Sequence, residues 1–177
     1  MPEQTSSQRW SRVALPLVLL GLYSTLAFAR TISNALRDAN LLRVSVGVLF
    51  GVVTLSLLIA VLRSHELRRP RVLIVAAFVA LAYGLVVFPM ESPEEKLHFV
   101  EYGVVGVLAF FASPLRWSEL RRFLSAALFT GAAGWLDEGI QALLPSRYYD
   151  LRDVGFNALA GVMALSALAL VRLFSRG

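Results

Sequence analysis

The side chains best suited to chemistry lie in the second half of the chain, inside stretches that are otherwise apolar. Two adjacent acids, Asp137 and Glu138, lie in one such stretch, and Gln141 follows about one helical turn later. His98 lies in an earlier stretch and Asn157 in a later one. Imidazole and carboxylate groups exchange protons and bind divalent metal ions, whereas amide side chains form neutral hydrogen bonds. This set of residue types therefore suits either acid–base chemistry or the binding of a polar group.

Helical spacing predicts that these side chains share faces. Tyr102 lies four residues after His98, and Glu101 lies three residues after it, so both are neighbours of the histidine on a helix. Asp137 and Glu138 point about 100° apart on a helix, so they are not expected to face the same partner.

The next segment repeats the pattern, because Asp153, Asn157 and Gly161 are spaced four residues apart. Gly131 and Gly134 lie just before the acidic pair, and small residues allow helices in membranes to approach closely. We therefore expect a tight contact of three helices that turns the carboxylates toward one another and away from lipid.

The elements that position these residues are predicted to be membrane-spanning helices. The chain has 177 residues, of which 57% are hydrophobic and only 16% are charged. A soluble domain is roughly half apolar and about a quarter charged, so the composition excludes a small soluble domain, and it excludes a disordered chain as well. The long apolar runs have the length of a transmembrane helix, about 17–25 residues. They are residues 13–29, 44–62, 72–88, 97–113, 123–144 and 154–174.

The fold class that follows is an all-α integral membrane protein with six transmembrane helices. Its predicted organisation is a cytoplasmic N-terminal segment, residues 1–12, followed by a single transmembrane domain, residues 13–174. The first run ends in Ala27-Phe28-Ala29, which resembles a signal-peptide cleavage site. Its length exceeds that of a signal peptide's apolar region, which favours an uncleaved helix.

The distribution of Lys and Arg predicts that the N- and C-termini are both cytoplasmic. With that orientation the cytoplasmic segments carry eleven of the 17 basic residues and the opposite side carries six. The polar residues of the last three runs then lie at their extracytoplasmic ends. Because the basic residues are spread over short loops, nucleic-acid binding is not expected.

Simple structural roles are also predicted for some of the polar residues. Ser92, Pro93 and Glu95 fit a capping box at the start of the fourth helix. Asp150 and Asp153 are suited to cap the sixth helix and to complement its dipole.

Two parts of the chain resemble motifs of the VanZ-like family. The first motif is similar to EKLHFVEYG at residues 95–103, although only Leu97 separates Lys96 from His98 and the family's commoner form has two residues there. The second motif is similar to DEGIQ at 137–141, PSR at 145–147, DLRDV at 150–154 and NALAG at 157–161. The resemblance covers roughly residues 94–163.

The resemblance implies a multi-pass protein of the bacterial inner membrane with a role in the cell envelope. The family's namesake is associated with low-level resistance to teicoplanin, a lipoglycopeptide. Our first hypothesis is that a polar site at the outer membrane face binds an amphiphile or a lipid-linked envelope molecule. Besides His98 and Glu138, the expected binding residues are Glu101, Tyr102, Asp137, Gln141, Arg147, Asp153 and Asn157.

Two alternatives remain open from the sequence. In the first, the protein is a hydrolase or transferase for a lipid or envelope substrate, with His98 as general base and Glu138 as general acid. A divalent metal ion bound by His98 with Glu101 or Glu138 and Asp153 is a variant of it, without a recognised metal motif. In the second, the polar residues clamp helices together or serve assembly with a partner protein. The sequence leaves the metal, the ligand and the oligomeric state undetermined.

Overall fold

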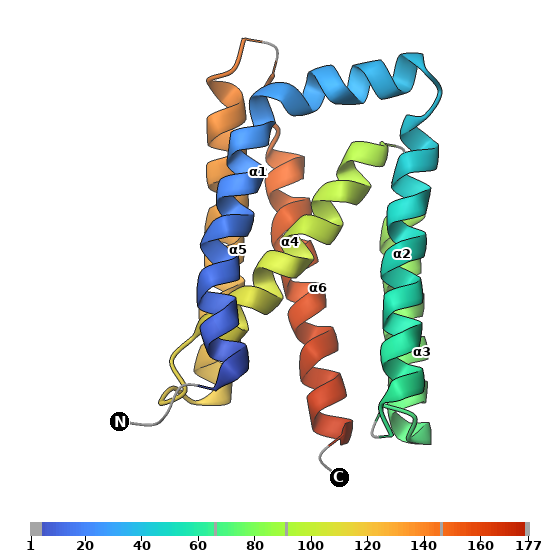
Figure 1. Ribbon diagram of the computed structural model, residues 1–177. Coiled ribbons are helices and arrows are strands. Elements are labelled where there is room, and N and C mark those ends of the chain that lie inside the picture. Colours follow the sequence, from blue (N-terminus) through green and yellow to red (C-terminus); the bar gives the residue numbers. More distant parts are fainter. Residues whose placement is uncertain (1–4, 66, 91, 146, 176–177) are drawn as a thin grey trace. The chain divides into compact units, whose positions relative to one another are not determined.

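The computed structural model describes residues 5–65, 67–90, 92–145 and 147–175, and all regular secondary structure within them is α-helix (Figure 1). These residues form α1 (Ser6–Asp38), α2 (Leu42–Arg63), α3 (Pro70–Val87), α4 (Pro93–Ala112), α5 (Glu119–Ala142) and α6 (Leu151–Ser175). The predicted all-α fold is confirmed, and each predicted apolar run overlaps one helix. Each helix begins two to seven residues before its run.

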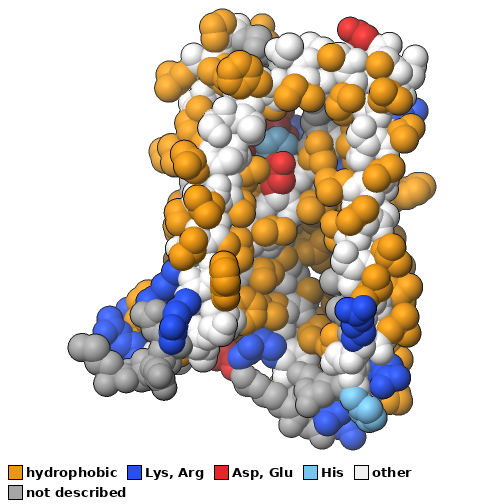
Figure 2. Space-filling view, in the orientation of Figure 1, with side chains coloured by type: hydrophobic (Ala, Val, Ile, Leu, Met, Phe, Trp, Pro, Cys, Tyr) orange, Lys and Arg blue, Asp and Glu red, His pale blue; other side chains and the backbone are white. Residues whose placement is uncertain are grey.

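Four of these helices are long and apolar enough to cross a membrane. The segments are Ser6–Ala29 within α1, Leu42–Arg63, Pro70–Val87 and Leu151–Phe174. The other two helices, α4 and α5, have 20 and 24 residues but carry the ionisable side chains described above. Large hydrophobic side chains such as Leu17, Leu128 and Trp135 are exposed, and hydrophobic groups cover most of the helices visible in Figure 2. Soluble proteins rarely expose so much apolar surface, so the chain is of the multi-pass membrane type.

The contacts between helices divide the chain into two compact units. The first unit comprises Met1–Thr31 and His98–Leu165, and the second comprises Ile32–Leu97 and Ser166–Gly177. The first unit therefore contains α5 and most of α1, α4 and α6, whereas the second contains α2 and α3. All candidate site residues predicted from the sequence lie in the first unit.

Within the first unit, hydrogen bonds fix the direction of the helices. Three side chains of α1 and α5 donate to carbonyl groups at the C-terminal end of α4. These bonds run from Arg122 Nη2 to Phe110 O over 3.1 Å, from Arg12 Nε to Ala112 O over 3.1 Å and from Gln8 Nε2 to Ser113 O over 2.7 Å. The last carbonyl groups of a helix have no partner within it, so these bonds satisfy them. The starts of α1 and α5 thus lie beside the end of α4, and α4 is antiparallel to both.

Side-chain caps mark the starts of three helices. The bonds join Glu95 N to Ser92 Oγ (3.4 Å) at α4, Arg121 N to Ser118 Oγ (3.3 Å) at α5 and Arg152 N to Asp150 Oδ1 (2.7 Å) at α6. Such bonds pair amide groups that have no partner inside the helix. The capping roles predicted for Ser92 and Asp150 are therefore confirmed.

Glycines bring α4, α5 and α6 into close contact. A Cβ atom added at Gly134 of α5 would lie 2.6 Å from Asn157 Cβ of α6. One added at Gly161 of α6 would lie 2.5 Å from Thr130 Cγ2 of α5, and one at Gly106 of α4 would lie 3.3 Å from the Gly161 backbone. At Gly134 and Gly161 a side chain would therefore clash with the neighbouring helix, and at Gly106 it would be tightly packed. The expected close contact of three helices is present.

Candidate functional site

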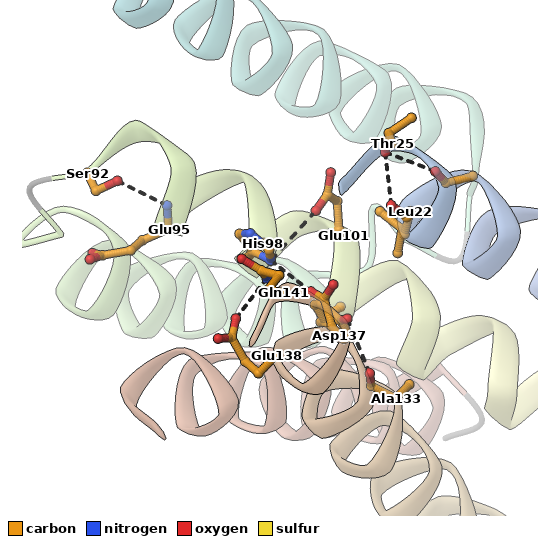
Figure 3. A network of polar contacts seen from close by, with 12 residues as sticks. Leu22, Thr25, Ser92, Glu95, His98, Glu101, Ala133, Asp137, Glu138 and Gln141 are labelled. Carbon is orange, nitrogen blue, oxygen red and sulfur yellow. Dashed lines mark hydrogen bonds and ion pairs between the residues drawn. The ribbon is translucent and has the colours of Figure 1, made fainter. Parts of the chain in front are cut away.

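A contact between His98 of α4 and Asp137 of α5 lies at the centre of the site. His98 Nδ1 is 3.5 Å from Asp137 Oδ2 and 4.0 Å from Glu101 Oε2, one turn along its own helix (Figure 3). The Asp137 side chain is 2% exposed and that of His98 is 18% exposed. A buried carboxylate needs such a partner, because removing its charge from water is costly. The structure thus brings together two residues that are far apart in the sequence.

Two tyrosines lie beside this pair. The Tyr102 ring is fully buried and stacks on His98, with centroids 6.3 Å apart and planes inclined by 8°. Its hydroxyl donates to Ala133 O over 3.4 Å, and the hydroxyl of Tyr23 from α1 donates to the same oxygen over 2.9 Å. Ala133 lies one turn before Asp137, so both hydroxyls lie next to the acid.

Tyr23 is a site residue that sequence analysis missed. It lies in the first apolar run, which carries no charged side chain, and it is 110 residues from Ala133 in the chain. Its only signal is a lone tyrosine in an apolar helix, and such tyrosines also occur simply as lipid-facing residues.

Glu138 has a different environment from its neighbour. Its side chain is 1% exposed, and both carboxylate oxygens accept hydrogen bonds within the protein. Oε1 accepts from Gln141 Nε2 over 2.9 Å, and Oε2 accepts from the backbone N–H of Asp150 over 3.1 Å. The adjacent acids therefore face different partners, as expected from helix geometry. The acid that His98 contacts is Asp137 and not Glu138. The roles of His98 as general base and of Glu138 as general acid stay predictions.

Asn157 of α6 is fully buried against Gly134 of α5. Asp153, one turn earlier, and Arg147, in the segment before α6, are both half-buried. Arg147 interacts electrostatically with Asp137 and with Asp153. The start of α6 thus adds polar groups to the same end of the unit that holds His98 and Asp137.

Several buried polar atoms of the site have no hydrogen-bond partner among the described residues. They are His98 Nδ1, Asp137 Oδ1, Arg147 Nε and both amide atoms of Asn157. An unpaired buried polar group costs about 1–3 kcal/mol, and most such groups in proteins have a partner. A molecule with complementary polar groups would pair with these atoms.

A metal-binding cluster was one hypothesis from the sequence. Over the described parts of the chain, no group of three or more His, Asp or Glu side chains is arranged so that it could hold a metal ion.

The site thus combines an acid–histidine contact, buried tyrosines and unpaired polar groups at one end of the first unit. Comparison of the chain with protein-family models, with curated proteins and with solved structures found no match.

Proposed function

We propose that this chain is a VanZ-like protein of the bacterial inner membrane that binds the polar head of an amphiphile or of a lipid-linked cell-envelope molecule. The observation that carries the proposal is the set of unpaired polar atoms on Asp137, Asn157 and Arg147. In apolar surroundings such atoms are costly, so a polar ligand that pairs with them gains free energy on binding. Ionisable groups within membrane helices usually mark functional sites.

The proposal includes six membrane spans with both termini in the cytoplasm. With 20 and 24 residues, α4 and α5 are about 30 and 36 Å long, enough to cross the hydrocarbon core. Arg12 and Arg122 lie at the end of the first unit opposite to His98 and Asp137. Since basic residues accumulate on the cytoplasmic side, this arrangement supports a site in the outer half of the membrane. Through the family resemblance, the proposal extends to a link with lipoglycopeptide resistance.

A specific observation also favours the enzymatic alternative. General bases use a histidine with a carboxylate beside it, and Asp137 Oδ2 lies 3.5 Å from His98 Nδ1, although no hydrogen bond joins the two atoms. The role of Glu138 as a general acid belongs to this alternative. The structural-clamp alternative is favoured by the hydrogen bond from Asp150 N to Glu138 Oε2, which joins the end of α5 to the start of α6.

Native mass spectrometry of the full chain, extracted gently from bacterial membranes, tests the proposal. We expect the wild type to retain an amphiphile whose mass identifies it, and Asp137→Asn to reduce the retained fraction about tenfold, which is the worth of one hydrogen bond to a charged group. Asp38→Asn is the matched control, because Asp38 is exposed at the end of α1. A wild-type chain without any bound amphiphile, or equal retention by Asp137→Asn, would contradict the proposal.

The same sample separates binding from catalysis. The identified amphiphile is incubated with the chain and its mass is followed over time. An unchanged mass agrees with a binding protein, whereas a product that forms with the wild type and is absent with His98→Asn and Glu138→Gln would establish the enzymatic alternative.

A further inference from the structure

The unpaired atoms of the site include groups of both charge signs. Asp137 is 2% exposed and offers a carboxylate oxygen, Oδ1, that accepts no hydrogen bond from the described residues. Arg147 offers a guanidinium nitrogen, Nε, that is buried and donates none within the same part of the chain. Asn157 is fully buried and adds one donor and one acceptor. His98 Nδ1 is unpaired among the described residues as well, but it already lies 3.5 Å from Asp137 Oδ2. Since Asn157 can both accept and donate, Asp137 and Arg147 decide which charges the ligand carries.

The balance of charge around these atoms is acidic. Glu138 is buried beside Asp137, and Glu101 and Asp153 are half-buried at the same end of the unit. His98 and Arg147 both attract Asp137 and Asp153, and Arg147 forms no ion pair with either acid in the region described. A purely anionic head would therefore meet several carboxylates, and like charges repel strongly where the dielectric constant is low. A purely cationic head would leave the buried nitrogen of Arg147 without a partner.

We infer, on the basis of the proposed function, that the ligand's head is a zwitterion, with an ammonium group that pairs with Asp137 and a phosphate or carboxylate group that pairs with Arg147. Charge-assisted bonds of both kinds are stronger than neutral ones, and guanidinium groups suit phosphate and carboxylate well. The amide of Asn157 hydrogen-bonds to either part of the head. This chemistry is present in the head of an aminophospholipid and also in a small free phosphoamine.

The first experiment compares two lipids that have the same acyl chains. The full chain is delipidated in detergent and titrated with phosphatidylethanolamine or phosphatidylglycerol, and the bound fraction is measured by native mass spectrometry. Only the first lipid carries an ammonium group. We expect it to bind at least about tenfold more tightly, the worth of one charge-assisted hydrogen bond.

Variants connect this preference to the two charged residues. Asp137→Asn is expected to weaken phosphatidylethanolamine about tenfold and to leave phosphatidylglycerol nearly unchanged, whereas Arg147→Gln weakens both lipids. Exposed Asp38 and Arg116 supply the matched controls, Asp38→Asn and Arg116→Gln, which should bind as the wild type does. Asp137→Glu is a second variant, for the case that thermal unfolding shows Asp137→Asn to be poorly folded. It keeps the negative charge and should therefore keep the preference for phosphatidylethanolamine.

Soluble probes test whether the site recognises the zwitterionic head by itself. Phosphoethanolamine should displace bound phosphatidylethanolamine, while inorganic phosphate at the same concentration should not. Two results would contradict the proposal that the head is a zwitterion. They are equal displacement by phosphate, and binding of phosphatidylglycerol as tight as that of phosphatidylethanolamine. Neither result would contradict the proposal that the chain binds an amphiphile. Failure to bind either lipid, with no displacement signal and no amphiphile in the freshly extracted chain, would overturn the proposed function itself.

Discussion

Asp137 and Glu138 are neighbours in the chain, but only Glu138 accepts a hydrogen bond at each of its carboxylate oxygens. Glu138 accepts from Gln141 Nε2 and from Asp150 N, so both of its oxygens are paired. Asp137 faces His98 with one oxygen, while the other accepts nothing from the described residues. At the scale of single residues, Glu138 therefore suits a role in holding α5 to the start of α6, and Asp137 suits a role toward a ligand.

This division predicts a stability effect at Glu138. Glu138→Ala should lower the free energy of unfolding by about 1–3 kcal/mol, because it leaves the buried amide of Gln141 and the part-buried N–H of Asp150 without their acceptor. Glu138→Gln should cost less, since its amide oxygen still accepts one of the bonds. Thermal unfolding in detergent measures both, with the exposed Asp38→Asn as control. An alanine variant as stable as the wild type would show that these bonds do not hold the helices together.

A second residue-scale prediction concerns Tyr23, which ties α1 to the site. Tyr23→Phe removes the donor of a 2.9 Å hydrogen bond to Ala133 O and should destabilise the chain by about 0.5–1.5 kcal/mol. Tyr148→Phe is the control, because the Tyr148 side chain is 85% exposed. Equal thermal stability of the Tyr23 variant and the control would mean that the bond from Tyr23 to Ala133 does not help to hold α1.

At the scale of elements, the sequence predicts where helices form better than how they pair. Length and apolar content locate all the helices, and Ser92 and Asp150 predict two of their starts correctly. The polar residues of α4, α5 and α6 are also predicted to meet, because their positions along the helices place them at one end. The contribution of α1 could not be predicted, since the Tyr23 contact spans 110 residues and leaves no periodic signal. The sequence also does not predict the contacts of Asp137 and Glu138. Helix periodicity gives the direction in which each side chain points, but it does not say which residue of another helix lies there.

The packing of α5 on α6 gives the prediction for this scale. Gly134→Ala should destabilise the chain and displace α6, because the added Cβ would lie 2.6 Å from Asn157 Cβ. Gly139→Ala is a matched control on the same helix, since nothing lies within 4 Å of the added atom there. Alanine forms helices better than glycine, so the control should be as stable as the wild type or more stable, by up to about 1 kcal/mol. Thermal unfolding in detergent compares the two, and equal stability would contradict the close contact.

At the scale of the whole molecule, composition establishes a multi-pass membrane protein, but it does not decide how many helices cross the membrane. Four helices have the length and composition of membrane spans, whereas α4 and α5 carry the ionisable residues of the site. A helix with buried charges can cross a membrane when those charges face protein and not lipid. In α5, Asp137, Glu138 and Gln141 are all buried, while Leu124, Leu128 and Trp135 are exposed. This division favours α5 as a true span.

The connection between α4 and α5 distinguishes six spans from four. If both helices cross, this connection is cytoplasmic; if neither crosses, it lies outside, on the same side as the connection between α1 and α2. The chain contains no cysteine, so single cysteines can be introduced without removing any native one. The positions are Ser118→Cys for the α4–α5 connection, Ala39→Cys for the α1–α2 connection and His65→Cys for the α2–α3 connection, all at exposed residues.

Labelling of intact cells with a membrane-impermeant maleimide then gives a definite expectation. Ala39→Cys should react and His65→Cys should not, whichever number of spans is correct, so these two variants serve as controls for sidedness. Ser118→Cys should remain unlabelled in intact cells and react only after the membrane is permeabilised, because the basic residues around it favour the cytoplasm. Labelling of Ser118→Cys in intact cells would mean that α4 and α5 do not cross. The polar site would then lie in a pair of helices held at the outer surface, where water, and not a membrane-embedded ligand, could pair with Asp137 and Asn157.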